Sequence, residues 1–161
     1  MSMHNWFEGK IRYEKINEAG MNVKVTEPYL VDALSFTEAE ARLIEELTPF
    51  ISGEFTVSDI KRANYKELFF SDEEAADRWF KCKLLFVVLD EKSGVEKRTP
   101  ANVLVQAADL RDAVKKLDEG MKGGLYRPDL TREDGLSETP IMDVYPYENK
   151  KEESESGEDE A

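Results

Sequence analysis

The segment from Tyr29 to Leu47, YLVDALSFTEAEARLIEEL, returns as Val103 to Met121, VLVQAADLRDAVKKLDEGM, without a gap over nineteen positions. In both copies a short, β-branched apolar run predicts a strand. Apolar residues at spacings of three and four follow it and predict one face of a helix. These residues are Phe36, Ala39, Leu43 and Leu47 in the first copy, and Leu110, Ala113, Leu117 and Met121 in the second.

Each predicted helix follows a residue suited to cap its first turn. Ser35 and Glu38 form a capping box, in which the acidic side chain returns to the amide of the cap residue. Asp109 and Asp112 occupy the corresponding places, with a shorter acidic side chain at the second position. The two helices are therefore expected to begin near residues 36 and 110.

The sequence repeat extends beyond these two segments, and all the matching segments together predict the fold. Trp6-Phe7 is echoed by Trp79-Phe80, and Val57-Ser58-Asp59-Ile60 resembles Ile141-Met142-Asp143-Val144. The sequence therefore predicts an α+β fold of two pseudo-symmetric ββαβ repeats. Each repeat would contain an antiparallel sheet and one main helix. Two units of this size can cover each other's apolar surface, so we expect them to pack as one compact domain.

A capping pattern and two prolines predict the boundaries within this duplicated domain, residues 1–147. The halves are expected at 6–70 and 79–147, and Ser71 followed by Glu74 predicts a short linking helix over 71–78. Pro28 and Pro100 are expected to interrupt the returning strands.

Two further segments are expected to lie outside regular structure. Residues 123–137, rich in Gly, Asp and Arg with little periodicity, predict a surface loop. The tail from 148 to 161 contains seven acidic residues and two lysines, so we expect it to be disordered.

Composition narrows the classes of function. The net charge is −13, and an acidic body disfavours nonspecific binding to nucleic acid. The single cysteine, Cys82, excludes an intramolecular disulfide. The N-terminal MSMHNWFEGK lacks the apolar core of a secretory signal. We therefore expect a cytoplasmic protein without a cofactor.

Four long runs of this chain carry a family resemblance. They are WFEGKIRYEK at 6–15, TEPYLVDAL to DRWFKCK at 26–83, LVQAADLRDAVKKLDEGMKG at 104–123 and PIMDVYPY at 140–147. These runs resemble a family of small proteins of unknown function from gut Bacteroidetes and their phages, domain of unknown function 4494. The resemblance covers most of Trp6 to Tyr147, except the loop at 124–138, and implies a cytoplasmic protein from a mobile element or prophage. It implies no activity and supplies no catalytic residue.

The densest basic cluster in this acidic chain is a candidate binding site. Its cations, amide and phenol could hold a phosphate, a nucleotide or an acidic protein surface. Alternatively, its charges pair with nearby acids on a solvated strand. The cluster consists of Lys61, Arg62, Asn64, Tyr65 and Lys66.

Aromatic and acidic residues at matching places are further candidates. Trp6 and Trp79 could stack on a base or anchor a partner, or they could cover the core. Asp59 and Asp143 could share a proton or bind a cation, although an Asp beside a bulge more often accepts hydrogen bonds from local backbone. Ile60 is out of phase with the preceding strand residues, which predicts such a bulge.

The remaining candidates favour structural interpretations. Lys10 and Lys83 could form a basic surface, but edge lysines that discourage aggregation are the simpler interpretation. Cys82 alternates with apolar residues, as a buried side chain would. His4 is the only histidine and lies near the N-terminus, so no Ser-His-Asp system or zinc site is predicted.

These observations support a non-enzymatic binding or adaptor protein of phage or mobile-element origin that acts through protein–protein contact. The alternative is binding of a small ligand, a nucleotide or single-stranded nucleic acid at the cleft between the two halves. A metal-dependent hydrolase that uses Asp59 and Asp143 is a third hypothesis.

Overall fold

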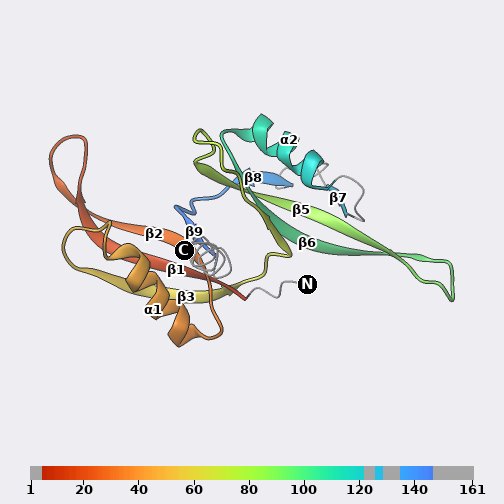
Figure 1. Ribbon diagram of the computed structural model, residues 1–161, viewed down its shortest axis with the longest axis horizontal. Coiled ribbons are helices and arrows are strands. Elements are labelled where there is room, and N and C mark those ends of the chain that lie inside the picture. The colour runs from red at the N-terminus through yellow and green to blue at the C-terminus, as the bar shows by residue number, and fades with distance from the viewer. Residues whose placement is uncertain (1–4, 122–125, 129–134, 147–161) are drawn as a thin grey trace, which may run out of the picture. The chain divides into compact units, whose positions relative to one another are not determined.

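The computed structural model describes residues 5–121, 126–128 and 135–146 (Figure 1). Its fold is α+β, with two helices and two sheets in the described part of the chain. The chain divides into two compact units, one of Met1–Ala63 with Ile141–Ala161 and one of Asn64–Pro140. Packing of the two as one domain stays a prediction. The predicted tail and His4 lie outside the described residues.

The first unit is a four-stranded sheet with one helix against it. The long hairpin of β1 and β2 is central, β3 runs antiparallel beside β1, and β9 runs parallel beside β2. Helix α1 follows the hairpin. The elements are β1 (Trp6–Ile16), β2 (Asn22–Asp32), α1 (Phe36–Leu47), β3 (Phe55–Ala63) and β9 (Val144–Tyr145).

The apolar stripe of α1 covers one face of this sheet, as the helical spacing predicts. Leu43 is fully buried and packs in one cluster with Phe7 and Ile11 of β1. Burial of such a side chain stabilises the fold by about 1.5–3 kcal/mol. Gly9 lies directly beneath Leu43, and a Cβ at Gly9 would overlap Leu43 Cδ1.

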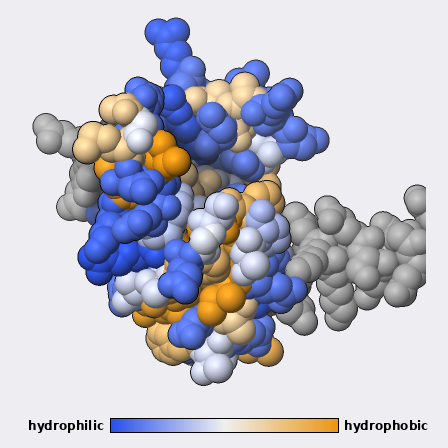
Figure 2. All heavy atoms as spheres, turned by 90° about the vertical axis from the view of Figure 1, so that its left-hand side faces the viewer, coloured by the Kyte–Doolittle hydropathy of each residue, from blue (hydrophilic) through white to orange (hydrophobic). Residues whose placement is uncertain are grey.

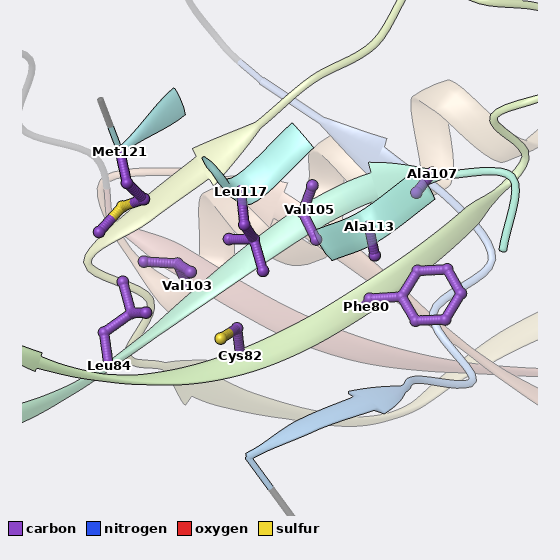
Figure 3. Close-up of a cluster of buried hydrophobic side chains, with 9 residues drawn as sticks. All are labelled: Phe80, Cys82, Leu84, Val103, Val105, Ala107, Ala113, Leu117 and Met121. Atoms are coloured by element: carbon purple, nitrogen blue, oxygen red, sulfur yellow. The ribbon is translucent and has the colours of Figure 1, made fainter. Parts of the chain in front are cut away.

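The second unit is also a hairpin with a helix after it. β5 and β6 form the hairpin, β4 runs parallel beside β6, and β7 and β8 run antiparallel beside β5. Figure 3 shows the side chains of α2 above those of the hairpin, with Leu117 among Val103, Val105 and Cys82. The elements are β4 (Glu67–Phe69), β5 (Arg78–Leu89), β6 (Glu96–Ala107), α2 (Leu110–Gly120), β7 (Tyr126–Pro128) and β8 (Leu136–Glu138).

Each sheet receives one edge strand from the other half of the sequence. β4 belongs to the first half of the sequence but pairs in the second unit, with Leu68 opposite Leu104. β9 belongs to the second half but pairs in the first unit, with Val144 opposite Leu30. The chain therefore leaves the first unit from the antiparallel strand β3 and the second from the antiparallel strand β8, and each time it adds a short parallel strand to the other unit.

The predicted linking helix over residues 71–78 is wrong. Residues 71–77 contain a turn at Glu74 and Ala75, and β5 already begins at Arg78. The Ser71 hydroxyl accepts a hydrogen bond from the N–H of Glu73, two residues on, at 3.2 Å. This contact closes a local turn rather than capping a helix.

The predicted strand interruptions at the two prolines are also wrong, because β2 continues through Pro28 and β6 through Pro100. The Pro28 carbonyl accepts from the N–H of Met142 at 2.9 Å, so this residue directs its backbone groups away from β1. The N–H that proline lacks would therefore not have joined the β1–β2 ladder.

Two other expectations need correction in part. The sheets are mixed rather than antiparallel, because β9 and β4 pair in parallel. The predicted loop at 123–137 contains the short strands β7 and β8, and residues 122–125 and 129–134 lie outside the described residues. The predicted bulge is confirmed, since the β1–β3 register shifts between Lys10 and Ile11.

Candidate partner-binding groove

A groove of about 1120 Å³ lies where the β1–β2 hairpin extends past β3. The pairing of β3 with β1 ends at Tyr13 opposite Phe55, whereas β1 continues to Ile16. The chain between α1 and β3 bounds the other side. The groove is lined by Arg12, Tyr13, Glu14, Lys15 and Ile16 of β1, Asn22 and Lys24 of β2, and residues 50–56.

Large apolar side chains are exposed around this groove. Phe50 is 79% exposed and Ile16 is 71% exposed. Met21, in the turn that follows β1, is 63% exposed. Figure 2 looks onto the side where the β1–β2 hairpin ends, and hydrophobic surface lies there among hydrophilic side chains. Exposed apolar residues that gather around a hollow are typical of an interaction site.

Local structure holds Phe50 outward. The backbone N–H groups of Phe50 and Ile51 both donate to the carbonyl of Leu47, at 3.0 Å each, so the chain turns sharply at the end of α1. Leu47 and the partly buried Ile51 face the core of the unit. Phe50 is left in solvent at the rim of the groove.

The charge of the lining differs from that of the whole chain. Its cations are Arg12, Lys15 and Lys24, against the two acids Glu14 and Glu54. The chain as a whole has 35 acidic and 22 basic residues. Lys15 is paired with the buried Glu27, so Arg12 and Lys24 remain against Glu14 and Glu54, and the lining is close to neutral on an acidic protein.

A buried carboxylate fixes two of the lining side chains. Glu27 is 8% exposed, and its Oε1 accepts from the Tyr13 hydroxyl at 2.6 Å. Its Oε2 lies 3.3 Å from Lys15 Nζ. Burial, together with the hydrogen bond and charge of Glu27, raises the pKa of Tyr13 well above its ordinary value, so the phenol stays protonated. Both side chains are held in place before any partner arrives.

An aromatic stack joins β9 to β2 in the same unit. The rings of Tyr29 and Tyr145 lie parallel, with centroids 6.1 Å apart. Burial raises the pKa of Tyr29 to about 12 and also raises that of Tyr145. The stack tightens the attachment of the short β9 strand.

The two predicted aspartates do not occupy equivalent places, so this prediction is wrong. Asp59 lies in β3 opposite Lys10, whereas Asp143 precedes the parallel strand β9. Asp143 Oδ1 accepts from the N–H of Val144 at 2.8 Å, and desolvation of the carboxyl raises its pKa. Among the described residues, no group of three or more His, Cys, Asp or Glu could hold a metal ion.

The predicted basic cluster is divided between several environments. Lys61 and Arg62 follow each other in β3 and therefore point to opposite faces of the sheet. Lys61 Nζ lies 3.4 Å from Glu8 Oε2. The Arg62 guanidinium lies 5.3 Å from the ring centroid of Phe7 and 5.7 Å from that of Phe36.

The rest of that cluster belongs to the second unit. Asn64, Tyr65 and Lys66 lead into β4, and the N–H of Lys66 donates to the Asn102 carbonyl at 2.7 Å. A binding role for the five residues stays a prediction.

The tryptophans and Cys82 are buried. Trp6 is 5% exposed and Trp79 is 2% exposed, and Trp79 meets the ring of Phe70 edge-on with centroids 5.5 Å apart. Cys82 is fully buried beneath α2. These positions agree with the core interpretation of the three side chains. Lys10 is exposed, and Lys83 is partly buried.

A smaller pocket in the second unit, of about 480 Å³, contains a cation that is already engaged. Lys116 Nζ lies 2.9 Å from Asp112 Oδ2, 3.2 Å from Glu73 Oε2 and 2.9 Å from Ser71 Oγ. Hydrogen bonds from Ala108 and Lys116 lower the pKa of Asp112. The network ties the segment before β5 to α2, so its role is structural.

Sequence patterns did not predict the groove, although two signals were present. Ile16 ends a strand beside a polar turn, and Phe50 follows the proline that ends the first helical pattern. Both are apolar residues at predicted turns. Packing of a core does not call for an apolar side chain at such positions. Such residues can be found from the sequence, but the surface that they share cannot.

Residues 5–147 match the family described as Domain of unknown function (DUF4494), and the chain belongs to that family. No curated protein and no solved structure gave a significant match to the chain. Among the described residues, no helix has the length and apolar character needed to cross a membrane.

Proposed function

We propose that this protein is a non-enzymatic binding or adaptor protein, and that the groove in its first unit is the surface that contacts a partner protein. The exposure of Phe50 and Ile16 beside a hollow carries the proposal. Apolar anchors at the centre of a contact supply most of the binding energy in protein interfaces.

The scaffold that presents this groove derives, in our proposal, from a duplicated ββαβ unit. Trp6 pairs with Asp32 in one hairpin, and Trp79 pairs with Gln106 at the matching register of the other. Ser35 and Asp109 cap the helices in the same way, each accepting from an N–H three residues on. The reciprocal pairing of β4 and β9 also supports this origin.

We also propose that this protein is cytoplasmic and comes from a phage or mobile element of gut Bacteroidetes. The resemblance described above supports that origin, and the single cysteine fits a reducing compartment.

Photo-crosslinking from the groove tests the proposed contact. A photoreactive phenylalanine analogue at position 50 should link a reproducible protein in a lysate of the native host. The same analogue at position 70 should not, although Phe70 is also exposed, at 46%. Phe50→Ser should abolish capture by the tagged protein, whereas Phe70→Ser should retain it. Capture of no reproducible partner, or equal capture by both variants, would contradict the proposal.

A second candidate function is binding of a small anionic ligand, a nucleotide or single-stranded nucleic acid. Arg12 and Lys24 near the exposed ring of Phe50 support it, since cations and aromatic rings together suit such ligands. The predicted Lys61 and Arg62 support it less, because each contacts another side chain. A saturable rise in melting temperature with nucleotides or oligonucleotides would favour this function, and a flat screen would remove it.

A further inference from the structure

We infer that Leu34, Phe36 and Arg62 form a second protein-binding surface on the first unit, which takes an acidic side chain of a partner protein beside an apolar one. This Arg62 surface is separate from the groove. Phe7, which lies opposite Arg62, and Tyr13, which lines the groove, are six residues apart in β1, or about 20 Å. The inference therefore goes beyond the proposed function and can fail without it.

The first argument is that aromatic rings, rather than an acid, hold the Arg62 guanidinium in place. Arg62 of β3 is directly opposite Phe7 of β1, so both side chains lie on the face of the sheet that α1 covers. The guanidinium lies 5.3 Å from the ring centroid of Phe7 and 5.7 Å from that of Phe36. The two rings meet edge-on, with centroids 5.0 Å apart. Attraction between the cation and the rings positions the guanidinium before any partner arrives.

The N–H groups of this guanidinium are available to a partner. Within the described part of the chain, Arg62 has no hydrogen bond and no ion pair, although acids outnumber bases by 35 to 22 in the whole sequence. The adjacent Lys61 points to the other face and lies 3.4 Å from Glu8. Arg62 is also exposed, so its donors can meet an incoming acceptor.

The second argument is the pair of exposed apolar side chains at the start of α1. Leu34 is 80% exposed and Phe36 is 49% exposed. Ser35 lies between them with an extended backbone, at φ −154° and ψ 166°, so the two side chains project on the same side of the chain. The Ser35 hydroxyl accepts from the N–H of Glu38 and fixes this geometry. An arginine beside an exposed aromatic ring is a combination that protein interfaces favour.

The charge of the Arg62 surface indicates a carboxylate rather than a phosphate group. A guanidinium binds a carboxylate through two parallel N–H···O bonds, and one charge balances the other. A phosphate group on a side chain carries about −1.5 to −2 charges, which one arginine does not balance. Glu38 in the first turn of α1 adds negative charge, and the net charge of −13 disfavours a nucleic acid. The matching ligand is therefore an Asp or Glu side chain with an apolar neighbour.

Peptide selection tests the inference on the full chain. A random heptapeptide library displayed on phage is first depleted on immobilised Arg62→Gln protein and then selected on the unchanged protein. We expect the surviving peptides to contain Asp or Glu beside a large apolar residue. Replacement of that acid by its amide in a fluorescein-labelled synthetic peptide should lower the affinity about tenfold or more, as measured by fluorescence anisotropy.

Matched variants locate the bound peptide. Leu34→Ser should weaken binding by about fivefold to tenfold, because it removes an apolar contact at an exposed position. Arg62→Lys should also weaken binding, since an ammonium group keeps the charge but not the planar pair of donors. Arg12→Gln makes the same change as Arg62→Gln at an exposed position on the opposite face of the sheet, and it should have little effect. Circular dichroism confirms that each variant is folded.

Several outcomes would overturn the inference. These are survival of no peptide, survival of peptides without an acid, or equal loss of binding for Arg62→Gln and Arg12→Gln. Full competition by millimolar inorganic phosphate would also overturn it, because the Arg62 surface would then be a general anion site. If position 50 still crosslinks to a lysate partner while no peptide depends on Arg62, the proposed function stands and the inference fails.

Discussion

At the residue scale, Gly9 shows how closely α1 packs on its sheet. In the sequence repeat Gly9 corresponds to Cys82 of the second half, and this correspondence predicts a small residue but not the reason for it. The structure supplies the reason, because Leu43 fills the space that a Cβ at Gly9 would need. The backbone at Gly9 has no positive φ, so steric space alone selects glycine here.

We therefore predict that Gly9→Ala destabilises the protein by about 1–3 kcal/mol, the usual cost of overpacking a well-filled core. Urea denaturation measures the change in the free energy of unfolding. Leu43→Ala should cost about 2–5 kcal/mol by leaving a cavity. Adding Gly9→Ala to Leu43→Ala should then cost much less than Gly9→Ala alone, because the overlap is gone. Additive costs would show that the two side chains do not compete for space.

At the element scale, local signals predicted the helices well. Ser35 Oγ accepts from the N–H of Glu38 at 3.1 Å, and Asp109 Oδ1 accepts from that of Asp112 at 2.8 Å. Both helices begin at the residue after the predicted cap. Capping and apolar spacing lie within a few residues of each other, so they can be recognised without knowledge of the fold.

Removal of either cap should have a similar effect. Ser35→Ala and Asp109→Ala should each lower the free energy of unfolding by about 0.5–2 kcal/mol, since each leaves a backbone N–H of the first turn without its acceptor. Ser35→Asp should retain most of the stability, because its carboxylate can accept the same bond and suits the helix N-terminus. A loss for Ser35→Asp as large as that for Ser35→Ala would indicate that the hydroxyl has another role. Chemical denaturation followed by circular dichroism distinguishes these outcomes.

Elements that depend on distant partners were predicted less well. The Ser71–Glu74 pattern resembles the caps, yet the N–H of Ser71 donates to Gln106 Oε1 at 3.0 Å, and the segment runs directly into β5. A similar four-residue pattern made Asp143 look equivalent to Asp59. Strand pairing instead places Asp143 before β9, a parallel strand of the same unit as Asp59, whereas Asp59 lies within an antiparallel strand. Short patterns carry too little information to identify a partner more than a hundred residues away.

At the scale of the whole molecule, the candidate groove combines segments that sequence patterns treat separately. The hairpin end and the chain after α1 meet because β3 stops short of the end of β1. Periodicity predicted each strand, but it does not give the relative lengths of paired strands. The basic cluster was visible in the sequence because its residues are adjacent. Adjacency in a strand, however, directs Lys61 and Arg62 to opposite faces.

The exchange of β4 and β9 leads to the last prediction. Truncation after Thr139 removes β9 together with Ile141 and Val144, which are 5% and 6% exposed. Each contributes about 1.5–3 kcal/mol by burial. We expect this truncation to destabilise the first unit, although the deleted residues belong to the second half of the sequence. Truncation after Pro146, which leaves β9 in place, is the control and should have little effect.

Each unit has one buried tryptophan, so the two can be followed separately. Trp79→Phe leaves Trp6 as the reporter of the first unit, and Trp6→Phe leaves Trp79 as the reporter of the second. A fall in the Trp6 urea midpoint alone would show that the units unfold independently. A parallel fall in both midpoints would show one cooperative body, as the single-domain prediction requires. No fall in the Trp6 midpoint would contradict a stabilising role for β9, since removal of two buried side chains must then cost nothing.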